Sequence, residues 1–170
     1  AREQALTRRE GLFRLCQRLG CQYVTRERNV HAKAGNINDA MKKTSGDLLL
    51  ILDADHVPTE NFLENTVGLF NQDEKLFLVQ TPHFFVNPDP IEKNLNTFYS
   101  APSENEMFYR VVQQGLDYWN SSFFCGSGAL LRRSMVEAQG GMSGETITED
   151  AETALSLHGR GYNSAFISEP

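Results

Sequence analysis

The sequence predicts an α/β fold in which a mostly parallel sheet is flanked by helices. Segments with strand character alternate with segments with helix character along the whole chain, and one expected strand, residues 47–54, contains the uninterrupted apolar run 48–52. Such a run is typical of a central strand that is covered on both faces. The alternation is typical of a layered architecture built from strand–helix–strand units.

In the first half of the chain, helices are expected where apolar residues recur at helical spacing, and strands where short apolar runs occur. The expected helices cover residues 3–19, residues 34–46 and the segment after Pro58, and the expected strands cover residues 21–26 and 47–54. Gly20 and Gly46 mark the ends of the first two helices. Thr59 is a suitable N-cap for the third.

The second half continues the alternation. The expected strands cover residues 75–82, 128–133 and 163–168, and the expected helices lie near residues 91–98, 107–116 and 146–161. Thr146 and Glu149 have the spacing of a capping box at the start of the last helix.

Composition indicates one soluble globular domain spanning residues 1–170. The chain has 40% apolar residues and a net charge of -6, which argues against a nucleic-acid partner because such partners call for a basic surface. Its three cysteines lack zinc-site spacing and are expected to be free thiols. No apolar run reaches the roughly 20 residues that cross a bilayer. Both ends fall beside expected elements, so we expect a piece of a larger protein that is truncated at both ends.

The stretch "LLLILDADHVPTENF" places Asp53 and Asp55 at the end of a very apolar strand. Side chains two apart on an extended segment point to the same side, so the two carboxylates are expected to share one target. Hard carboxylates suit Mg²⁺ or Mn²⁺, and Mg²⁺ completes its shell with phosphate oxygens and water. The pair is therefore interpreted as a clamp for a metal bound to a diphosphate. The alternative is an acidic turn without function.

The stretch "HAKAGNIN" combines a cation with a glycine. Lys33 suits a phosphate, and Gly35 permits close approach of the backbone to a ligand. The helix that follows could add N–H donors to an anion. A plain glycine turn with a surface lysine explains the residues equally well.

The stretch "TITEDAET" places Asp150 in the first turn of the last expected helix. A helix N-terminus stabilises negative charge, and an ionised carboxylate at a cleft edge can accept a proton from an attacking hydroxyl. Simple helix capping is the alternative, but Thr146 and Glu149 already meet that need.

Two further segments carry polar residues at strand ends. "WNSSFFCGSGA" is rich in aromatic residues and glycine, which suits either a sugar ring or a packed core, and its Cys125 is interpreted as a structural thiol. "VQTPHFF" places His83 after a strand, within reach of the cleft expected beside Asp53.

Taken in order, six stretches resemble the catalytic domain of the bacterial cellulose synthases, which are processive family 2 glycosyltransferases. The six stretches are "HAKAGNIN", "DADHVPT", "QTPHFF", "NPDPIEKNL", "FFCGSGALLRR" and "TEDAETAL". The resemblance covers most of the chain from His31 onward and implies a glycosyltransferase A-type (Rossmann-like) fold. It also implies that a uracil-binding aspartate lies upstream and a "QxxRW" motif downstream of this chain. Gly128 stands where related sequences often carry a cysteine, an exchange expected to be harmless.

The resemblance assigns donor-side roles to five residues. It implies that Asp53 and Asp55 bind Mg²⁺ or Mn²⁺, with Asp53 also contacting the diphosphate and His83 completing the metal site. It implies that Lys33 and Tyr109 contact the UDP-linked donor.

On the acceptor side, the resemblance implies that Asp150 is the general base that deprotonates the attacking hydroxyl. Phe123, Cys125 and Glu149 are implied to contact the terminal sugar of the acceptor.

The implied activity is transfer of glucose from UDP-glucose to the non-reducing end of a β-1,4-glucan, with inversion. The parent protein is expected in the bacterial inner membrane, with this domain on the cytoplasmic side, a periplasmic accessory subunit, and regulation by cyclic-di-GMP. Two alternatives stay open. One is another processive β-glycan synthase, making chitin, hyaluronan or a periplasmic glucan. The other is a nucleotide-sugar or glucan-binding module without turnover, and the isolated chain is expected to be inactive.

Overall fold

The structure is a computed structural model that describes residues 2–26 and 28–168. The chain divides into two compact units, of which the first ends at Thr44 and the second begins at Ser45. The N-terminal unit contains helices α1 (Arg2–Leu19) and α2 (Ala32–Met41). The C-terminal unit contains every strand of the described chain and nearly all of the predicted site residues.

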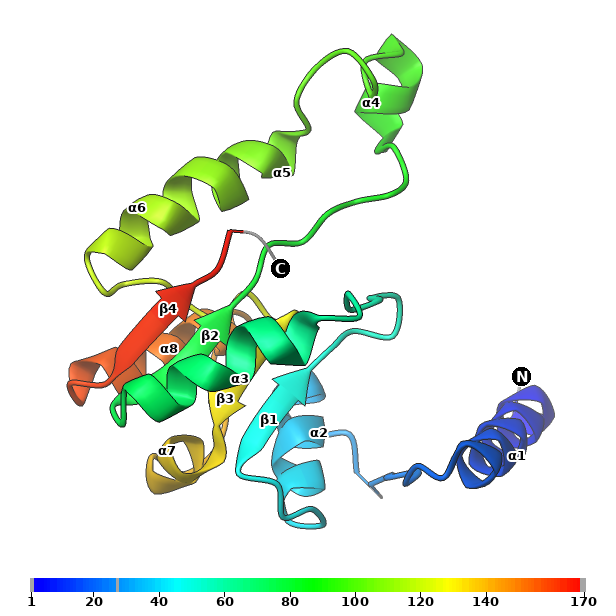
Figure 1. The fold of residues 1–170 in the computed structure, drawn as a ribbon. Coiled ribbons are helices and arrows are strands. Elements are labelled where there is room, and N and C mark those ends of the chain that lie inside the picture. Colours follow the sequence, from blue (N-terminus) through cyan, green and yellow to red (C-terminus); the bar gives the residue numbers. More distant parts are fainter. Residues whose placement is uncertain (1, 27, 169–170) are drawn as a thin grey trace. The chain divides into compact units, whose positions relative to one another are not determined.

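The C-terminal unit alternates strands and helices (Figure 1). In chain order its elements are β1 (Leu48–Ile51), α3 (Phe62–Gln72), β2 (Leu76–Gln80), α4 (Pro90–Leu95), α5 (Glu104–Met107), η1 (Phe108–Val112), α6 (Gln113–Tyr118), β3 (Ala129–Arg132), α7 (Arg133–Ala138), α8 (Glu149–Gly159) and β4 (Asn163–Phe166). Helices α5 and α6 are continuous through the π-helical turn η1.

The four strands form one mixed sheet with the order β1-β3-β2-β4. Strand β3 is antiparallel to both β1 and β2, with Leu131 opposite Leu49 and Leu78, whereas β2 and β4 are parallel. Strands β1, β2 and β4 therefore run in one direction, and β3 is inserted against them. Their carboxyl ends meet at one edge of the sheet, together with the segment that enters β3.

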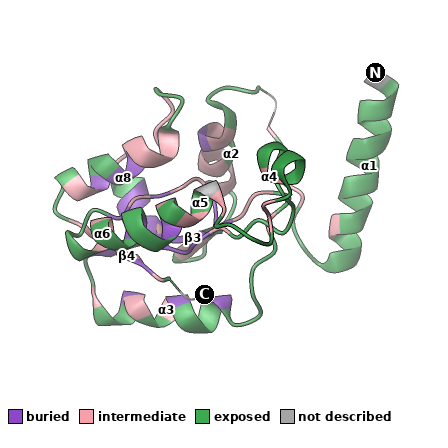
Figure 2. Cartoon of the chain, turned by 90° about the horizontal axis from the view of Figure 1, so that it is seen from above, coloured by how far each residue is buried: buried purple, intermediate pink, exposed green. Residues whose placement is uncertain are grey.

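Helices cover both faces of the sheet. Helix α3 lies on one face and α8 on the other, and buried residues gather on the strands and on the inward sides of these helices (Figure 2). Every residue of β2 is buried, which is why its sequence "LFLVQ" is apolar almost throughout. Helix α3 contributes Phe62 and Phe70 to a hydrophobic core cluster. The strands contribute Leu76, Val79 and Leu130 to the same cluster.

Several sequence expectations are wrong in detail. Residues 21–26 form no strand. Helix α3 has Asn61 rather than Thr59 at its N-cap. Helix α8 has Thr148 at its N-cap, and the hydroxyl of Thr146 donates a hydrogen bond to Glu152 Oε2 (2.8 Å) rather than closing a capping box with Glu149. The capping box occurs instead in α4, between Asp89 and Glu92.

The helix expected near residues 91–98 ends at Leu95 because Asn96 adopts a left-handed conformation. Helix α7 follows β3 directly and has no counterpart among the helices expected from the sequence. In the described part of the chain, none of the helices has both the length and the apolar character needed to cross a membrane.

Candidate active site

The predicted carboxylate pair lies in a tight turn beyond β1. The strand ends at Ile51, and the backbone N–H of His56 donates to the carbonyl of Asp53 over 3.0 Å. We call residues 53–56 the DADH turn. Because these residues turn rather than extend, the alternation rule used to place Asp53 and Asp55 on one side does not apply. Asp53 is half-buried and Asp55 is exposed.

A buried serine connects this turn to the segment before β3. We call residues 122–128 the SFFCGSG loop. The Ser127 hydroxyl accepts a hydrogen bond from the backbone N–H of Asp53 (2.8 Å) and is bonded to His56 Nδ1 (2.7 Å). Ser127 is 1% exposed, so these bonds are shielded from water. The DADH turn is thereby attached to the SFFCGSG loop.

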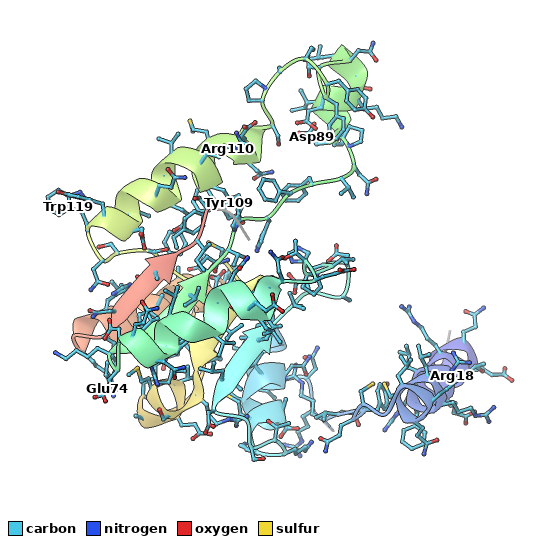
Figure 3. All side chains as sticks on the ribbon, viewed as in Figure 1. Arg18, Glu74, Asp89, Tyr109, Arg110 and Trp119 are labelled. Atoms are coloured by element: carbon cyan, nitrogen blue, oxygen red, sulfur yellow. The ribbon has the colours of Figure 1, made fainter. Side chains whose placement is uncertain are left out.

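His83, in the segment that follows β2, is held on both sides of its ring. The Ser127 carbonyl lies 2.8 Å from Nε2 and can only accept, so Nε2 carries the proton. Nδ1 then accepts from the hydroxyl of Tyr109 at 2.7 Å. Tyr109 projects from the η1 turn toward the strand ends, whereas Trp119 projects away from the sheet (Figure 3).

Two buried glutamines organise the SFFCGSG loop. Gln80 accepts a hydrogen bond from the Cys125 backbone N–H (2.9 Å) and donates to the Ser127 carbonyl (2.9 Å). Gln113 donates to Cys125 Sγ (3.0 Å) and accepts from the Ser122 hydroxyl (2.9 Å). Both glutamines are fully buried, so their polar groups depend on these partners.

Asp150 is the second residue of α8, and its Oδ1 accepts from the backbone N–H of Ala151 (2.8 Å). Burial, and then the negative charge of Asp150, raises the pKa of the Cys125 thiol to about 12. Burial, followed by the neighbouring Cys125 and Asp150 groups, also raises the pKa of Tyr109 well above its usual range. Asp150 is thus near both side chains, and the thiol and the phenol stay protonated at neutral pH.

Glu149 and Phe123 lie beside these groups in the chain. Glu149 is the first residue of α8, and its carbonyl accepts from the Thr153 hydroxyl (2.6 Å). Phe123 is half-buried and meets Phe108 of η1 edge-on, with ring centroids 6.0 Å apart. The aromatic contact joins the SFFCGSG loop to the helix that carries Tyr109.

A cavity of about 290 Å³ lies between the DADH turn and the segment that follows β2. Asp55, His56, His83 and Gly128 are among its lining residues, together with apolar side chains such as Phe62. The space beside the carboxylate turn is therefore mostly apolar with a few polar groups, as is common in small-molecule sites.

The sequence predicts a divalent metal site formed by Asp53, Asp55 and His83, and the structure has no preformed three-ligand cluster among the described residues. Among residues 2–26 and 28–168, no group of three or more His, Cys, Asp or Glu side chains is gathered closely enough to hold a metal ion. His83 uses both ring nitrogens in hydrogen bonds, so its role as a third ligand stays a prediction. Asp53 and Asp55 alone offer two hard oxygen donors, which fits an ion whose remaining ligands come from a diphosphate and water.

The sequence of residues 8–140 matches the profile described as Glycosyl transferase family 2. The chain belongs to this family. The match includes the DADH turn, Tyr109 and the SFFCGSG loop.

Several curated family 2 relatives are similar over nearly the whole chain. The cellulose synthase catalytic subunit [UDP-forming] of Pseudomonas fluorescens is 51% identical over 163 residues, and its counterpart in Xanthomonas axonopodis pv. citri is 52% identical. Cellulose synthase 1 catalytic subunit [UDP-forming] of Komagataeibacter xylinus is 47% identical. Each alignment covers 96% of this chain and 22% of the relative, so the chain spans only that share of these proteins.

A solved structure supports the fold. A mannosyltransferase from Pyrobaculum calidifontis, in complex with GDP-Man and Mn²⁺, matches with a TM-score of 0.55 and 21% sequence identity. The match covers 81% of this chain and 34% of that one. The predicted glycosyltransferase A-type fold is therefore confirmed. In the described chain its sheet is mixed, with two antiparallel strand pairs and one parallel pair, rather than mostly parallel as expected. A divalent metal is the ion generally used by family 2 enzymes, and Mn²⁺ accompanies the nucleotide sugar in this relative.

Lys33 belongs to the N-terminal unit, where it is half-buried on α2. Its contact with the donor stays a prediction. Gly35 lies inside α2 rather than in a turn before it, and a Cβ there would collide with the Val30 carbonyl and the Arg26 guanidinium. A glycine is therefore required at position 35 because the Val30 backbone and the Arg26 side chain pack against it.

The structure adds Ser127, His56, Gln80 and Gln113 to the residues predicted for the family 2 site. One of them left a signal in the sequence: Gln80 ends an otherwise apolar strand, and a buried amide requires hydrogen-bond partners. Ser127, His56 and Gln113 carry no comparable signal, because their roles arise from contacts between distant segments.

Proposed function

We propose that this chain forms part of the catalytic domain of an inverting, processive glycosyltransferase that makes β-1,4-glucan from UDP-glucose. The observation that carries the proposal is the 51% identity with a cellulose synthase catalytic subunit [UDP-forming] across 96% of the chain. The arrangement of the site supports it, because the predicted metal turn, Cys125 and Asp150 gather at one edge of the sheet.

Asp150 is proposed as the general base. A hydroxyl of the acceptor sugar attacks the anomeric carbon of the donor, its proton passes to the Asp150 carboxylate, and the bond between that carbon and UDP breaks. One displacement converts an α-linked donor into a β-linked product, so no covalent enzyme intermediate is required. The protonated Cys125 thiol agrees with this, because only a thiolate is an effective nucleophile.

The donor end is proposed to lie at the DADH turn. Asp53 and Asp55 would hold Mg²⁺ or Mn²⁺ together with the diphosphate, and the bound ion would supply Lewis-acid stabilisation of the leaving UDP. Tyr109 and His83 are proposed to border the donor, with their mutual hydrogen bond fixing the orientation of both rings. Lys33 is proposed to contact the diphosphate.

The acceptor end is proposed to lie at the SFFCGSG loop. Phe123 would offer an aromatic face to the terminal sugar, and Cys125 and Glu149 would offer polar contacts. Holding the acceptor hydroxyl in place supplies the proximity effect on which the displacement depends.

The proposal extends to the protein that contains this chain. We expect it in the bacterial inner membrane with this domain on the cytoplasmic side, assisted by a periplasmic subunit and controlled by cyclic-di-GMP. These features rest on the resemblance to bacterial cellulose synthases. Removal of cyclic-di-GMP from membranes that contain the full-length protein should lower synthesis, and unchanged synthesis would refute this extension.

The central test is UDP release from UDP-glucose by the full-length protein in membranes with Mg²⁺. Asp150→Asn should lower the rate at least about a thousandfold, within the range typical of general-base catalysis, while binding of UDP persists. Glu152→Gln is the matched control, since Glu152 lies in the first turn of the same helix and the charge change is identical. Equal rates in the two variants would remove Asp150 from the mechanism.

A donor screen separates this function from its rivals. UDP-glucose should be the donor that yields polymer when it is compared with UDP-N-acetylglucosamine and GDP-mannose. Polymer formed only from another donor would indicate a different β-glycan synthase with the same fold. Tight UDP binding without release of UDP from any sugar donor would indicate a binding module.

A further inference from the structure

Ser127 lies between the proposed donor site at the DADH turn and the proposed acceptor site at the SFFCGSG loop. It belongs to the SFFCGSG loop and is buried, with 1% of its surface exposed. All four of the hydrogen-bond partners named above come from other segments at the same sheet edge: Asp53 and His56 from the DADH turn, Gln80 from the end of β2, and His83 from the segment that follows β2.

The side chain of Ser127 serves the donor side. Its hydroxyl accepts the backbone N–H of Asp53, the residue whose carboxylate is predicted to hold the metal. The same oxygen bonds to Nδ1 of His56, which ends the DADH turn. The hydroxyl therefore holds both ends of this turn.

The backbone of Ser127 serves the acceptor side. Its carbonyl accepts from Gln80 Nε2, and the other end of the same amide group accepts from the Cys125 N–H. Gln80 Nε2 also lies 3.3 Å from the Gly128 carbonyl. One rigid amide thus spans the loop from Cys125 to Gly128.

We propose that Ser127 is a positioning residue that ties the DADH turn to the SFFCGSG loop and so fixes the separation between the metal-binding Asp53 and the acceptor-side Cys125. This role rests on the proposed function, because it assumes a metal-bound donor at one end and a sugar acceptor at the other. Ser127 itself contacts neither; it acts through the backbone of Asp53 and the amide of Gln80.

The physical reason is the burial of Ser127 itself, which is 1% exposed. Without the hydroxyl, the N–H of Asp53 loses its acceptor in a shielded position, and the turn must move to find another partner. A displacement of about 1 Å at a positioned group is enough to cost about a hundredfold in rate. The loss of the hydroxyl therefore acts directly on the DADH turn, and it reaches the SFFCGSG loop through the Ser127 backbone, whose carbonyl is bonded to Gln80.

The test uses the full-length protein and two readouts that need no turnover. The first is binding of Mn²⁺ in the presence of UDP, measured by electron paramagnetic resonance. The second is the rate at which iodoacetamide alkylates Cys125, measured by mass spectrometry at pH 9, where a small fraction of this thiol is ionised. Ser127→Ala should weaken Mn²⁺ binding by about tenfold and change the alkylation rate of Cys125 by a similar factor.

Three further variants isolate the coupling. Asp55→Asn should weaken Mn²⁺ binding and leave Cys125 alkylation unchanged, because it alters only the donor end. Ser164→Ala removes a buried hydroxyl of β4 whose oxygen has no hydrogen-bond partner, and it should change neither readout. Ser127→Thr retains the hydroxyl and should bind Mn²⁺ like the wild type.

The outcomes are distinct. A Ser127→Ala variant that changes only Cys125 alkylation would show a local role in its own loop and overturn the proposal, as would loss of Mn²⁺ binding in Ser127→Thr equal to that in Ser127→Ala. A wild type that binds no Mn²⁺ with UDP would overturn it as well. If the wild type binds Mn²⁺ and UDP but releases no UDP from UDP-glucose, the proposed function fails, and the variant comparison still decides the role of Ser127.

Discussion

The hydroxyl of Tyr109 lies 2.7 Å from Nδ1 of His83 and donates a hydrogen bond to it. The donor role follows from two facts: the opposite ring nitrogen of His83 faces a carbonyl, and the raised pKa of Tyr109 keeps the phenol protonated. The two side chains come from segments 26 positions apart, and each fixes the other at the predicted donor site.

Tyr109→Phe should therefore release the ring of His83 while preserving the aromatic packing. Loss of a single buried hydrogen bond is expected to lower the free energy of unfolding by about 1 kcal/mol and to weaken donor binding by about tenfold. Thermal unfolding and the KM for UDP-glucose measure the two effects. Tyr118→Phe is the control, because Tyr118 is 82% exposed. A KM equal to that of the wild type would argue against any role of this pair in donor binding.

Alkaline pH should destabilise the protein through Cys125. Its pKa rises from the ordinary value of 9.0 to about 12 in the folded state, so the folded state keeps its proton where the unfolded state loses it. Stability from this group is complete below about pH 9 and is lost as the pH rises from 9 toward 12. Tyr109 acts in the same direction from its ordinary value of 10.0 upward.

Urea unfolding at pH values from 7 to 11 measures this loss. The midpoint for the wild type should fall once the pH passes 9, and the fall should be shallower in Cys125→Ser, which has no thiol to titrate. Parallel pH profiles for the two proteins would show that the thiol is not protected from ionisation by the fold.

Gln113 and Gln114 offer a matched pair for testing the support of the SFFCGSG loop. Gln113 is buried and bonded to Cys125 and Ser122, whereas Gln114, the next residue of α6, is exposed. Gln113→Met should lower the free energy of unfolding by about 1–3 kcal/mol, because it leaves the Ser122 hydroxyl without its acceptor. Gln114→Met should have little effect. Thermal unfolding of both variants decides the matter, and equal stability would refute the proposed support.

The parts of the fold that the sequence predicts are those with local signals. The apolar runs that form β1 and β2, and the helix that presents Asp150, follow from the residues themselves. The insertion of β3 between β1 and β2 does not, because strand pairing joins segments far apart in the chain. Residues 21–26 have strand composition but pair with no strand, which shows that β-propensity needs a neighbouring strand.

The same limit applies to the candidate site. Asp53, His83 and Asp150 stand out in the sequence because each is a charged or titratable residue close to the end or the start of a regular element. Ser127 does not, since its bond to Asp53 joins residues 74 positions apart and its bond to Gln80 joins residues 47 apart. A polar residue that positions others is visible only after the chain has folded.

Gly128 provides the last prediction, on the space around His83. Its φ is +59°, and a Cβ added there would lie 2.9 Å from His83 Nε2 and 3.3 Å from Thr81 Oγ1. Gly161 has a similar φ of +80° but nothing within 4 Å of an added Cβ. Both Gly128→Ala and Gly161→Ala incur the strain of a left-handed residue, about 1–2 kcal/mol, but only the first crowds the site.

Gly128→Ala should therefore cost about 1–3 kcal/mol more than Gly161→Ala, the range expected for overpacking a filled space. It should also slow UDP release by the full-length protein, because His83 must move from the Ser127 carbonyl to make room. Thermal unfolding and UDP release compare the two variants directly. If both variants lose the same stability and both keep full activity, the ring of His83 is free to shift, and its fixed position is not what the site requires.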